Sequence, residues 1–288
     1  LEDTFTMLGE LGRGGSAVVY RARDRARKTE VAVKVVRARF ADDAAEDLDR
    51  LRHEARTVVR LQHPHIVRVH EVRGLADGGL AMVMQRVNGR TLKQAIRAEG
   101  AFAPERVEQV LLEIGDALAF AHAHGVIHRD VKPENIFLEM GTRRALLSDF
   151  GIAYSADGDV PVCLTGSAIG TPTYMAPEQV ESTTIDARAD LYSLGLVAWE
   201  MLTGRQPWAG EPLYQVLYKQ QYEPLPSIES LRPNAVPARL QYIVETLLAK
   251  NPAHRFESAA ALLSALRQWR EPADWSAWLN ARARNAEA

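Results

Sequence analysis

The chain has 288 residues, of which 47% are hydrophobic and 25% are charged, a composition typical of a soluble globular protein. Its formal net charge is -2, with 35 basic and 37 acidic residues, so composition does not indicate a nucleic-acid partner, which would require a basic surplus. The single cysteine, Cys163, excludes an intrachain disulfide and is typical of a reducing compartment.

The start of the chain, Leu1-Glu2-Asp3, lacks the basic residues of a signal peptide. Because the first residue is not Met, we interpret the sequence as a fragment of a longer protein. Its most apolar stretch, residues 194–202, is too short to cross a bilayer. We therefore expect a cytoplasmic location and no membrane contact by this fragment, while a tether through a span outside it stays open.

Strands are predicted at the start of the chain, over residues 5–11, 18–23 and 31–36, where apolar residues are β-branched or alternate with polar ones. A helix is predicted from about residue 43 to Pro64, followed by two further strands over 66–72 and 80–87. The pattern indicates a small β-rich lobe over about residues 1–85.

Long helices dominate after a hinge at residues 86–89. Pro104 opens one helix and Gly125 closes it, and others are predicted over 189–203, 238–248 and 258–269. Residues 155–168 are small, polar and non-periodic, and we expect a loop there. The pattern predicts an α-rich large lobe over residues 90–270 and a C-terminal extension helix over 271–288.

A glycine-rich turn follows the first predicted strand and contains Gly12, Gly14 and Gly15. Glycines allow backbone N–H groups to approach phosphate oxygens, because no Cβ stands in the way. A plain hairpin turn would have the same composition, so this motif alone does not decide between the two.

Lys34 ends an apolar strand and would ordinarily be a solvated charge. Glu54, however, borders the apolar face of its predicted helix, three residues after Leu51 and four before Val58. A carboxylate there needs a partner, because an unpaired buried charge is costly. We expect Lys34 to pair with Glu54 and to hold nucleotide phosphates.

Asp130 and Asn135 lie five residues apart in one polar loop, and Asp149 follows after an apolar run and a turn. Asn135 and Asp149 offer the oxygen ligands that Mg²⁺ prefers, which leaves Asp130 to orient a hydroxyl and accept its proton. Lys132 is placed to neutralise charge on a phosphoryl group. The alternative, a polar loop with an Asx turn, does not explain why these residues recur together.

These motifs, with Asp149-Phe150-Gly151 and Ala176-Pro177-Glu178, resemble the eukaryotic-type Ser/Thr protein kinase family, specifically its bacterial branch, over about residues 5–270. The resemblance implies an α+β, bilobal protein kinase fold, with a small antiparallel β-sheet lobe that has one helix and a larger, mainly α-helical lobe. It implies ATP and Mg²⁺ as cofactors, with Mn²⁺ as an alternative metal.

The resemblance also implies residue roles. Asp130, Lys132, Lys34 and Glu54 would be catalytic, and Asn135 and Asp149 the metal ligands. Asp190 resembles a residue that braces the catalytic loop, and Arg255 one that pairs with Glu178. The third loop glycine of the family is Ala17 here, which we expect to preserve ATP binding. The nucleotide contacts would be Leu11, Gly12, Arg13, Gly14, Gly15, Ser16, Ala17, Val18, Val19, Ala32, Lys34, Met84, Gln85, Val87 and Phe137.

Regulation is predicted in the activation segment. Lys132 and Thr171 resemble the Ser/Thr-specific pattern, so protein Ser/Thr substrates are expected. A phosphate on Thr165, or secondarily Ser167, would pair with Arg129, although Arg129 also has a structural interpretation through backbone carbonyls. Autophosphorylation at a single site is the resulting hypothesis. A homodimer through the small lobe, seen in relatives, stays open.

Two other classes of protein are less compatible with the sequence. A pseudokinase scaffold would lack a catalytic lysine, aspartate or metal ligand, and a small-molecule kinase would lack the activation segment. Zinc binding by His63 and His65, or by His122 and His124, is not expected, because ligand spacing is absent. We expect the tryptophans of the C-terminal extension to pack on the large lobe rather than bind a membrane or partner.

Overall fold

The computed structural model describes residues 4–14, 17–36, 58–76, 79–150, 172–181, 185–269, 275 and 278–280. Several predicted features lie outside these residues: most of the helix from about residue 43, the loop over 155–168 and most of the C-terminal extension. Of the first of these, residues 58–60 are described and are helical.

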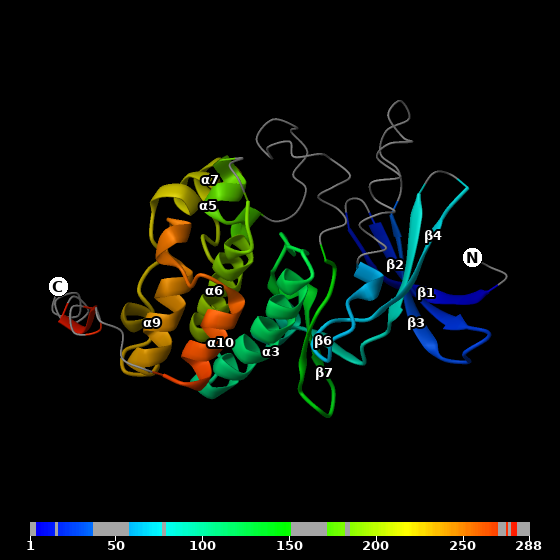
Figure 1. Ribbon diagram of the computed structural model, residues 1–288, viewed down its shortest axis with the longest axis horizontal. Coiled ribbons are helices and arrows are strands. Elements are labelled where there is room, and N and C mark those ends of the chain that lie inside the picture. Colours follow the sequence, from blue (N-terminus) through cyan, green and yellow to red (C-terminus); the bar gives the residue numbers. More distant parts are fainter. Residues whose placement is uncertain are drawn as a thin grey trace.

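The strands predicted in the small lobe are confirmed. Within the described residues they form one antiparallel sheet in the order β1-β2-β3-β5-β4 (Figure 1), with bounds β1 Phe5–Arg13, β2 Ala17–Asp24, β3 Glu30–Val36, β4 Val69–Gly74 and β5 Leu80–Gln85. β4 begins later than the predicted residue 66, because Ile66 instead forms an isolated bridge with Leu147 of the large lobe. Together with the hydrogen bond from Val67 N–H to the Leu147 carbonyl, this bridge joins the two lobes.

The two faces of this sheet have different neighbours. Val31 and Val33 belong to a small cluster under the outer face, with Phe5 and Ala22. Because side chains alternate along a strand, Ala32 lies on the opposite face, which joins the main core. The sheet therefore presents one of its faces to the large lobe.

The large lobe contains a second small sheet and a set of helices. The sheet has the order β6-β7-β8, with β6 Gly89–Thr91, β7 Ile136–Glu139 and β8 Ala145–Leu147. It lies between the small lobe and the helices (Figure 1). The helices are α2 Leu92–Glu99, α3 Pro104–Ala123, α5 Pro177–Glu181, α6 Arg188–Thr203, α7 Leu213–Tyr222, α8 Ile228–Leu231, α9 Ala238–Leu247 and α10 Ala259–Arg267.

Helix α6 lies at the centre of this lobe, and every one of its residues after Arg188 is buried. It contacts α3, α8 and α9. Gly195 permits the close approach of α9, since a Cβ at this position would lie 2.8 Å from Leu247 Cβ. A helix that is apolar on all sides is expected to be buried, and its few polar residues then require partners.

The tryptophans near the C-terminus pack on α9, as predicted. Trp275 stacks on Trp278 with ring centroids 5.1 Å apart, and both meet the edge of Tyr242 at 5.8 and 5.7 Å. Trp278 Nε1 also donates to Glu245 Oε2 at 2.6 Å. The cluster therefore joins the described part of the extension to the large lobe.

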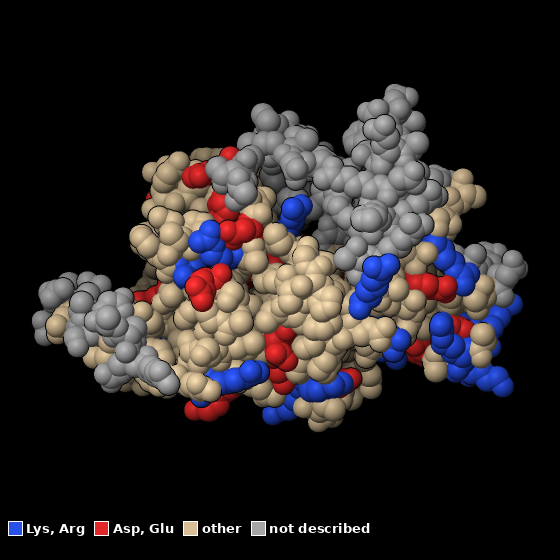
Figure 2. Space-filling model, in the orientation of Figure 1, with Lys and Arg blue, Asp and Glu red and all other residues tan. Residues whose placement is uncertain are grey.

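The surface carries charges of both signs. On the face in Figure 2, basic side chains gather mainly over the small lobe, whereas basic and acidic side chains lie next to each other over the helical lobe. Among the described residues, none of the helices has the length and apolar character needed to span a bilayer.

Candidate active site

Asp130 lies in the loop between α3 and β7, and two neighbouring side chains fix its carboxylate. Lys132 Nζ donates to Oδ1 at 2.8 Å, and Asn135 Nδ2 donates to Oδ2 at 2.9 Å. Asn135 Nδ2 also donates to the Asp130 carbonyl at 2.8 Å. A 3-10 turn over Pro133–Asn135 brings Asn135 back toward Asp130. The loop thus brings together three of the predicted site residues.

Asp149 follows β8 with a φ of 60°, a conformation that non-glycine residues rarely adopt. Its Oδ1 accepts a hydrogen bond from Lys34 Nζ at 2.8 Å. Burial opposes ionisation of Asp149, but the charge and hydrogen bond of Lys34 outweigh it, so the pKa of the Asp149 carboxyl is below its usual value. Lys34 therefore meets a metal-ligand candidate directly, a contact that was not predicted.

The backbone of the loop is held by a buried carboxylate on α6. Asp190 is fully buried, and it accepts from the backbone N–H groups of His128 at 2.8 Å and Arg129 at 2.7 Å. His122 Nε2 donates a third hydrogen bond to it at 2.7 Å. This arrangement keeps Arg129 at a φ of 63°. Asp190 thus braces the loop as the resemblance implied.

His122 is a site residue that sequence reasoning missed, since it was weighed only as a metal ligand. A usable signal was present, because His122 follows Leu118 by four residues and therefore shares the buried face of α3.

His128 connects the loop of Asp130 to the strand that leads to Asp149. Its Nε2 donates to the Ser148 carbonyl at 2.8 Å, which leaves Nδ1 to accept from the Asp130 N–H at 3.2 Å. Its ring also packs on Phe150, with centroids 4.6 Å apart. The two acidic residues are therefore joined through one buried imidazole.

The end of the activation segment is attached to the same region. Arg255 forms the predicted pair with Glu178, with Nη1–Oε1 and Nη2–Oε2 distances of 2.7 and 2.8 Å. Gln179 Nε2 donates to the Arg129 carbonyl at 3.0 Å, which joins α5 to the loop that contains Asp130. Planar, bidentate pairs of this kind fix orientation as well as distance.

Strand register places the nucleotide candidates on the sheet face that points to the large lobe. Val19 pairs with Lys34, and Ala32 pairs with Met84, so their side chains share one face. The backbone of Val87 forms no hydrogen bond with another described residue, which leaves it available to a ligand. Gly15, Ser16, Glu54, Thr165, Ser167 and Thr171 lie outside the described residues.

The donor atoms present suit a hard cation. Asn135 donates through Nδ2 to Asp130, which leaves its Oδ1 as an acceptor, and Asp149 keeps Oδ2 beyond the bond to Lys34. In the part of the chain that is described, no group of three or more His, Cys, Asp or Glu side chains is arranged to hold a metal. Two oxygen donors alone fit Mg²⁺ that keeps substrate phosphates among its ligands.

Comparison with known proteins identifies relatives over nearly the whole chain. The sequence model of the protein kinase domain family matches residues 5–266. The serine/threonine-protein kinases PknB and PknD of Mycobacterium tuberculosis are 41% and 39% identical over 91% and 90% of this chain, which spans 42% and 38% of their lengths. The crystal structure of the M. tuberculosis PknI kinase domain matches with a TM-score of 0.72 and 30% identity, covering 92% of this chain and 96% of that one.

Proposed function

This chain belongs to the protein kinase family, and from that premise we propose that it transfers the γ-phosphoryl group of ATP to Ser and Thr hydroxyls of proteins. The observation that carries the proposal is the Asp130 carboxylate, held by Lys132 and Asn135 and joined through His128 to Asp149. Each of these contacts orients a group that phosphoryl transfer requires.

The proposed mechanism depends on positioning and electrostatics. Asp130 orients the attacking hydroxyl and accepts its proton, while Lys132 neutralises charge on the phosphoryl group. Asn135 and Asp149 would hold Mg²⁺, or Mn²⁺ as the alternative, which would supply positive charge at the phosphates when bound. Lys34 holds the nucleotide phosphates, in partnership with Glu54.

The adenine is proposed to lie on the inner face of the small-lobe sheet. Val19 and Ala32 lie on that face, Phe137 would close the site from β7, and Val87 would donate its backbone N–H. Met84 is buried at the back, where it would limit the size of a bound ligand. The glycine-rich turn would cover the phosphates.

Asp130→Asn tests the proposal. Loss of the general base is expected to lower kcat by about 10²–10⁴-fold with labelled ATP and a Ser-containing peptide. Lys34→Met is expected to abolish measurable transfer. Asp116→Asn on α3, where the carboxylate meets His63, serves as a matched control with normal turnover. Near-normal turnover of Asp130→Asn would refute the assignment.

We also propose that the chain phosphorylates its own activation segment at Thr165, with Ser167 as the second candidate and Thr171 contacting the catalytic aspartate. The support lies at Arg129, because its backbone is already held by Asp190 and Gln179 while its guanidinium has no partner among the described residues. A phosphate would supply one. Mass spectrometry of the active protein should find phosphate on Thr165, whereas phosphate found only elsewhere contradicts this.

The regions that flank this chain, and its partners, are proposed from its relatives. Because it spans about two fifths of the length of PknB and PknD, a sensor region and a membrane tether would lie outside residues 1–288. Its partners would be protein substrates and a second copy of itself, paired through the small lobe. Sedimentation of this chain, before and after phosphorylation, tests that pairing.

A further inference from the structure

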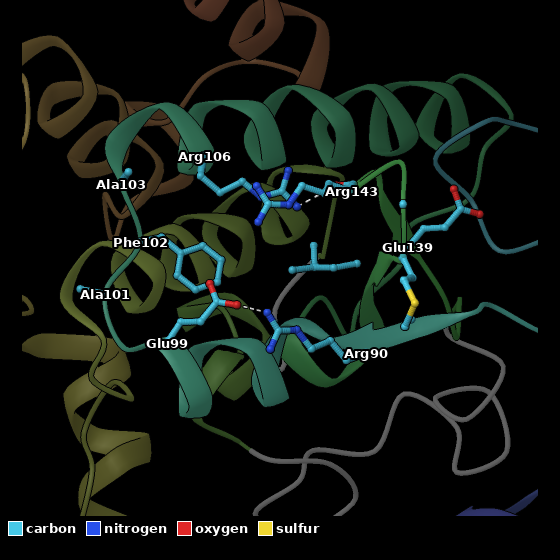
Figure 3. Close-up of a pocket in the computed structure, with 12 residues that line it drawn as sticks. Arg90, Glu99, Ala101, Phe102, Ala103, Arg106, Glu139 and Arg143 are labelled. Carbon is cyan, nitrogen blue, oxygen red and sulfur yellow. Dashed lines mark hydrogen bonds and ion pairs between the residues drawn. The ribbon is translucent and has the colours of Figure 1, made fainter.

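A hollow of about 560 Å³ lies in the large lobe, on the far side of the hinge from the small-lobe sheet. It is bounded by the end of α2, the linker to α3, the first turn of α3, the strands β6 and β7, and the turn between β7 and β8 (Figure 3). A hollow of this size matches sites that bind small molecules or short peptide segments. No residue given a role in phosphoryl transfer lines it.

The charges around the hollow do not balance. Arg90 is paired with Glu99, and the Glu139 carboxylate points away from the hollow (Figure 3) toward Arg144, which donates to it at 3.0 Å. Arg106 and Arg143 remain, and their side chains meet at one side of the hollow. The hollow therefore has a surplus of positive charge.

Neither of these two guanidinium groups has a carboxylate partner among the described residues. Arg106 donates to the Gln109 side chain and to the Arg143 carbonyl, both at 2.7 Å, and both acceptors are neutral. The Arg143 side chain is exposed and makes no hydrogen bond within the described chain. Partial burial lowers the pKa of Arg106; the charge of Glu113 opposes this shift, and the nearby charge of Arg143 acts in the same direction as burial. An anion would relieve this repulsion.

Between the charged groups the hollow is apolar. The Phe102 ring projects into it from the α2–α3 linker (Figure 3), and Leu138 lines it from β7. Met140, in the turn between β7 and β8, is 71% exposed, so its side chain is open to contact by a ligand in the hollow. A ligand that fits both features carries a negative charge next to an aliphatic group.

The hollow is physically connected to the phosphoryl-transfer site. Met140 follows Asn135 by five positions along an extended strand, so the two are separated by at most about 17 Å at ~3.3 Å per residue. Met140 N–H also donates to the Asn88 carbonyl at the hinge, at 2.7 Å. A flexible chain of about ten residues has a typical end-to-end distance of about 17 Å, so one polypeptide can occupy both places.

We propose that this hollow docks an extended segment of a protein substrate in which Asp or Glu alternates with aliphatic residues. The segment places its carboxylates on Arg106 and Arg143 and its aliphatic side chains on Phe102 and Met140. Docking raises the local concentration of the acceptor hydroxyl at Asp130. The inference rests on the proposed kinase function and concerns which substrates are chosen, not how the phosphoryl group moves.

Binding is tested separately from catalysis. Fluorescent eight-residue peptide libraries, in which Asp/Glu alternates with Leu/Val, are titrated with the intact chain and followed by anisotropy. Arg143→Glu and Arg106→Glu should each weaken binding about tenfold or more, because like charges now meet. Met140→Ser should weaken it less, and Arg23→Glu, an equal charge change on β2, should have no effect. Arg143→Glu changes an exposed side chain, so it keeps the test valid if Arg106→Glu fails to fold.

The best-binding sequence is then joined to a Ser-containing acceptor peptide through ten Gly/Ser residues, in either order. One of the two fusions should have a KM at least about tenfold below that of the acceptor alone, with kcat unchanged, and Arg143→Glu should remove the difference.

Absence of saturable binding, equal binding of a Lys/Leu library, or binding without a lower KM overturns docking. Self-association of the chain that Arg143→Glu abolishes would assign the hollow to a second copy and overturn it too. Failure of transfer to the acceptor alone, in contrast, contradicts the proposed function.

Discussion

Replacing Asp190 by Asn tests whether a buried carboxylate on α6 holds the catalytic loop in shape. The wild-type side chain is fully buried and accepts three hydrogen bonds, two of them from backbone N–H groups of the loop. An amide of the same shape offers one oxygen, and its NH₂ group must face one of these donors. At least one buried N–H group is then left without an acceptor.

The cost follows from the number and kind of bonds. Hydrogen bonds to a charged group contribute about 1.5–3 kcal/mol each, and a buried donor left without an acceptor costs about 1–3 kcal/mol more, so the expected loss is roughly 3 kcal/mol or more. For a domain in this size range, roughly 2–4 °C of Tm corresponds to each kcal/mol, so Tm should fall by about 6 °C or more. Released from Asp190, Arg129 can also leave its left-handed conformation, whose strain is of order 1–3 kcal/mol.

Two measurements separate stability from positioning. Thermal unfolding gives the first effect, and peptide phosphorylation well below both melting temperatures gives the second. Because a 1 Å displacement of a catalytic group can cost about 10²-fold, kcat should fall by about tenfold or more in fully folded protein. His122→Phe removes a single side-chain donor and should lower Tm by less, with a smaller loss of kcat. A variant Asp190→Asn with native Tm and native kcat would refute the reasoning.

Gly195→Ala should lower stability, because its methyl group would lie 2.8 Å from an α9 side chain. The overpacking costs about 1–3 kcal/mol, which exceeds the gain of about 1 kcal/mol in helix propensity. Urea unfolding gives the sign of the change in the free energy of unfolding. Glu178→Gln leaves the buried Arg255 charge unpaired and should cost about 3–5 kcal/mol by the same method, while a loss under about 1 kcal/mol contradicts this. Lys34→Met should move acid unfolding to higher pH. The lowered pKa of Asp149 stabilises the fold above pH 3.8, and this stabilisation is lost as the pH falls. Because removal of Lys34 raises the pKa of Asp149, the loss should begin at a higher pH, and an unchanged acid midpoint would be evidence against this role of Lys34.

Elements with a strong period were predictable from sequence. The helix over Pro104–Ala123 and the helix over Arg188–Thr203 have the expected positions within a residue or two, because proline and glycine bound them and apolar residues fill them. β6 was not predicted, since three residues with no apolar alternation form a strand only by pairing with β7. Helix α7 was missed as well, because its exposed tyrosines obscure any apolar stripe.

The candidate site shows a similar division. Asp130, Asn135 and Asp149 are recognisable because their chemistry requires fixed residue types at fixed spacing. The partners that hold them are harder to predict, because a residue such as His122 acts through a contact 68 positions away. The Lys34–Asp149 bond also depends on how the two lobes meet, which no local pattern specifies.

Helix α6 has a consequence for how such a protein can change over evolutionary time. Its buried polar residues each serve a different segment: Asp190 holds the catalytic loop, Ser193 Oγ donates to the Tyr174 carbonyl at 2.7 Å, and Glu200 accepts from Lys93 at 3.0 Å. A substitution that adapts one segment therefore disturbs the common core. New specificities should accumulate at positions that do not touch this helix, while α6 itself tolerates little variation.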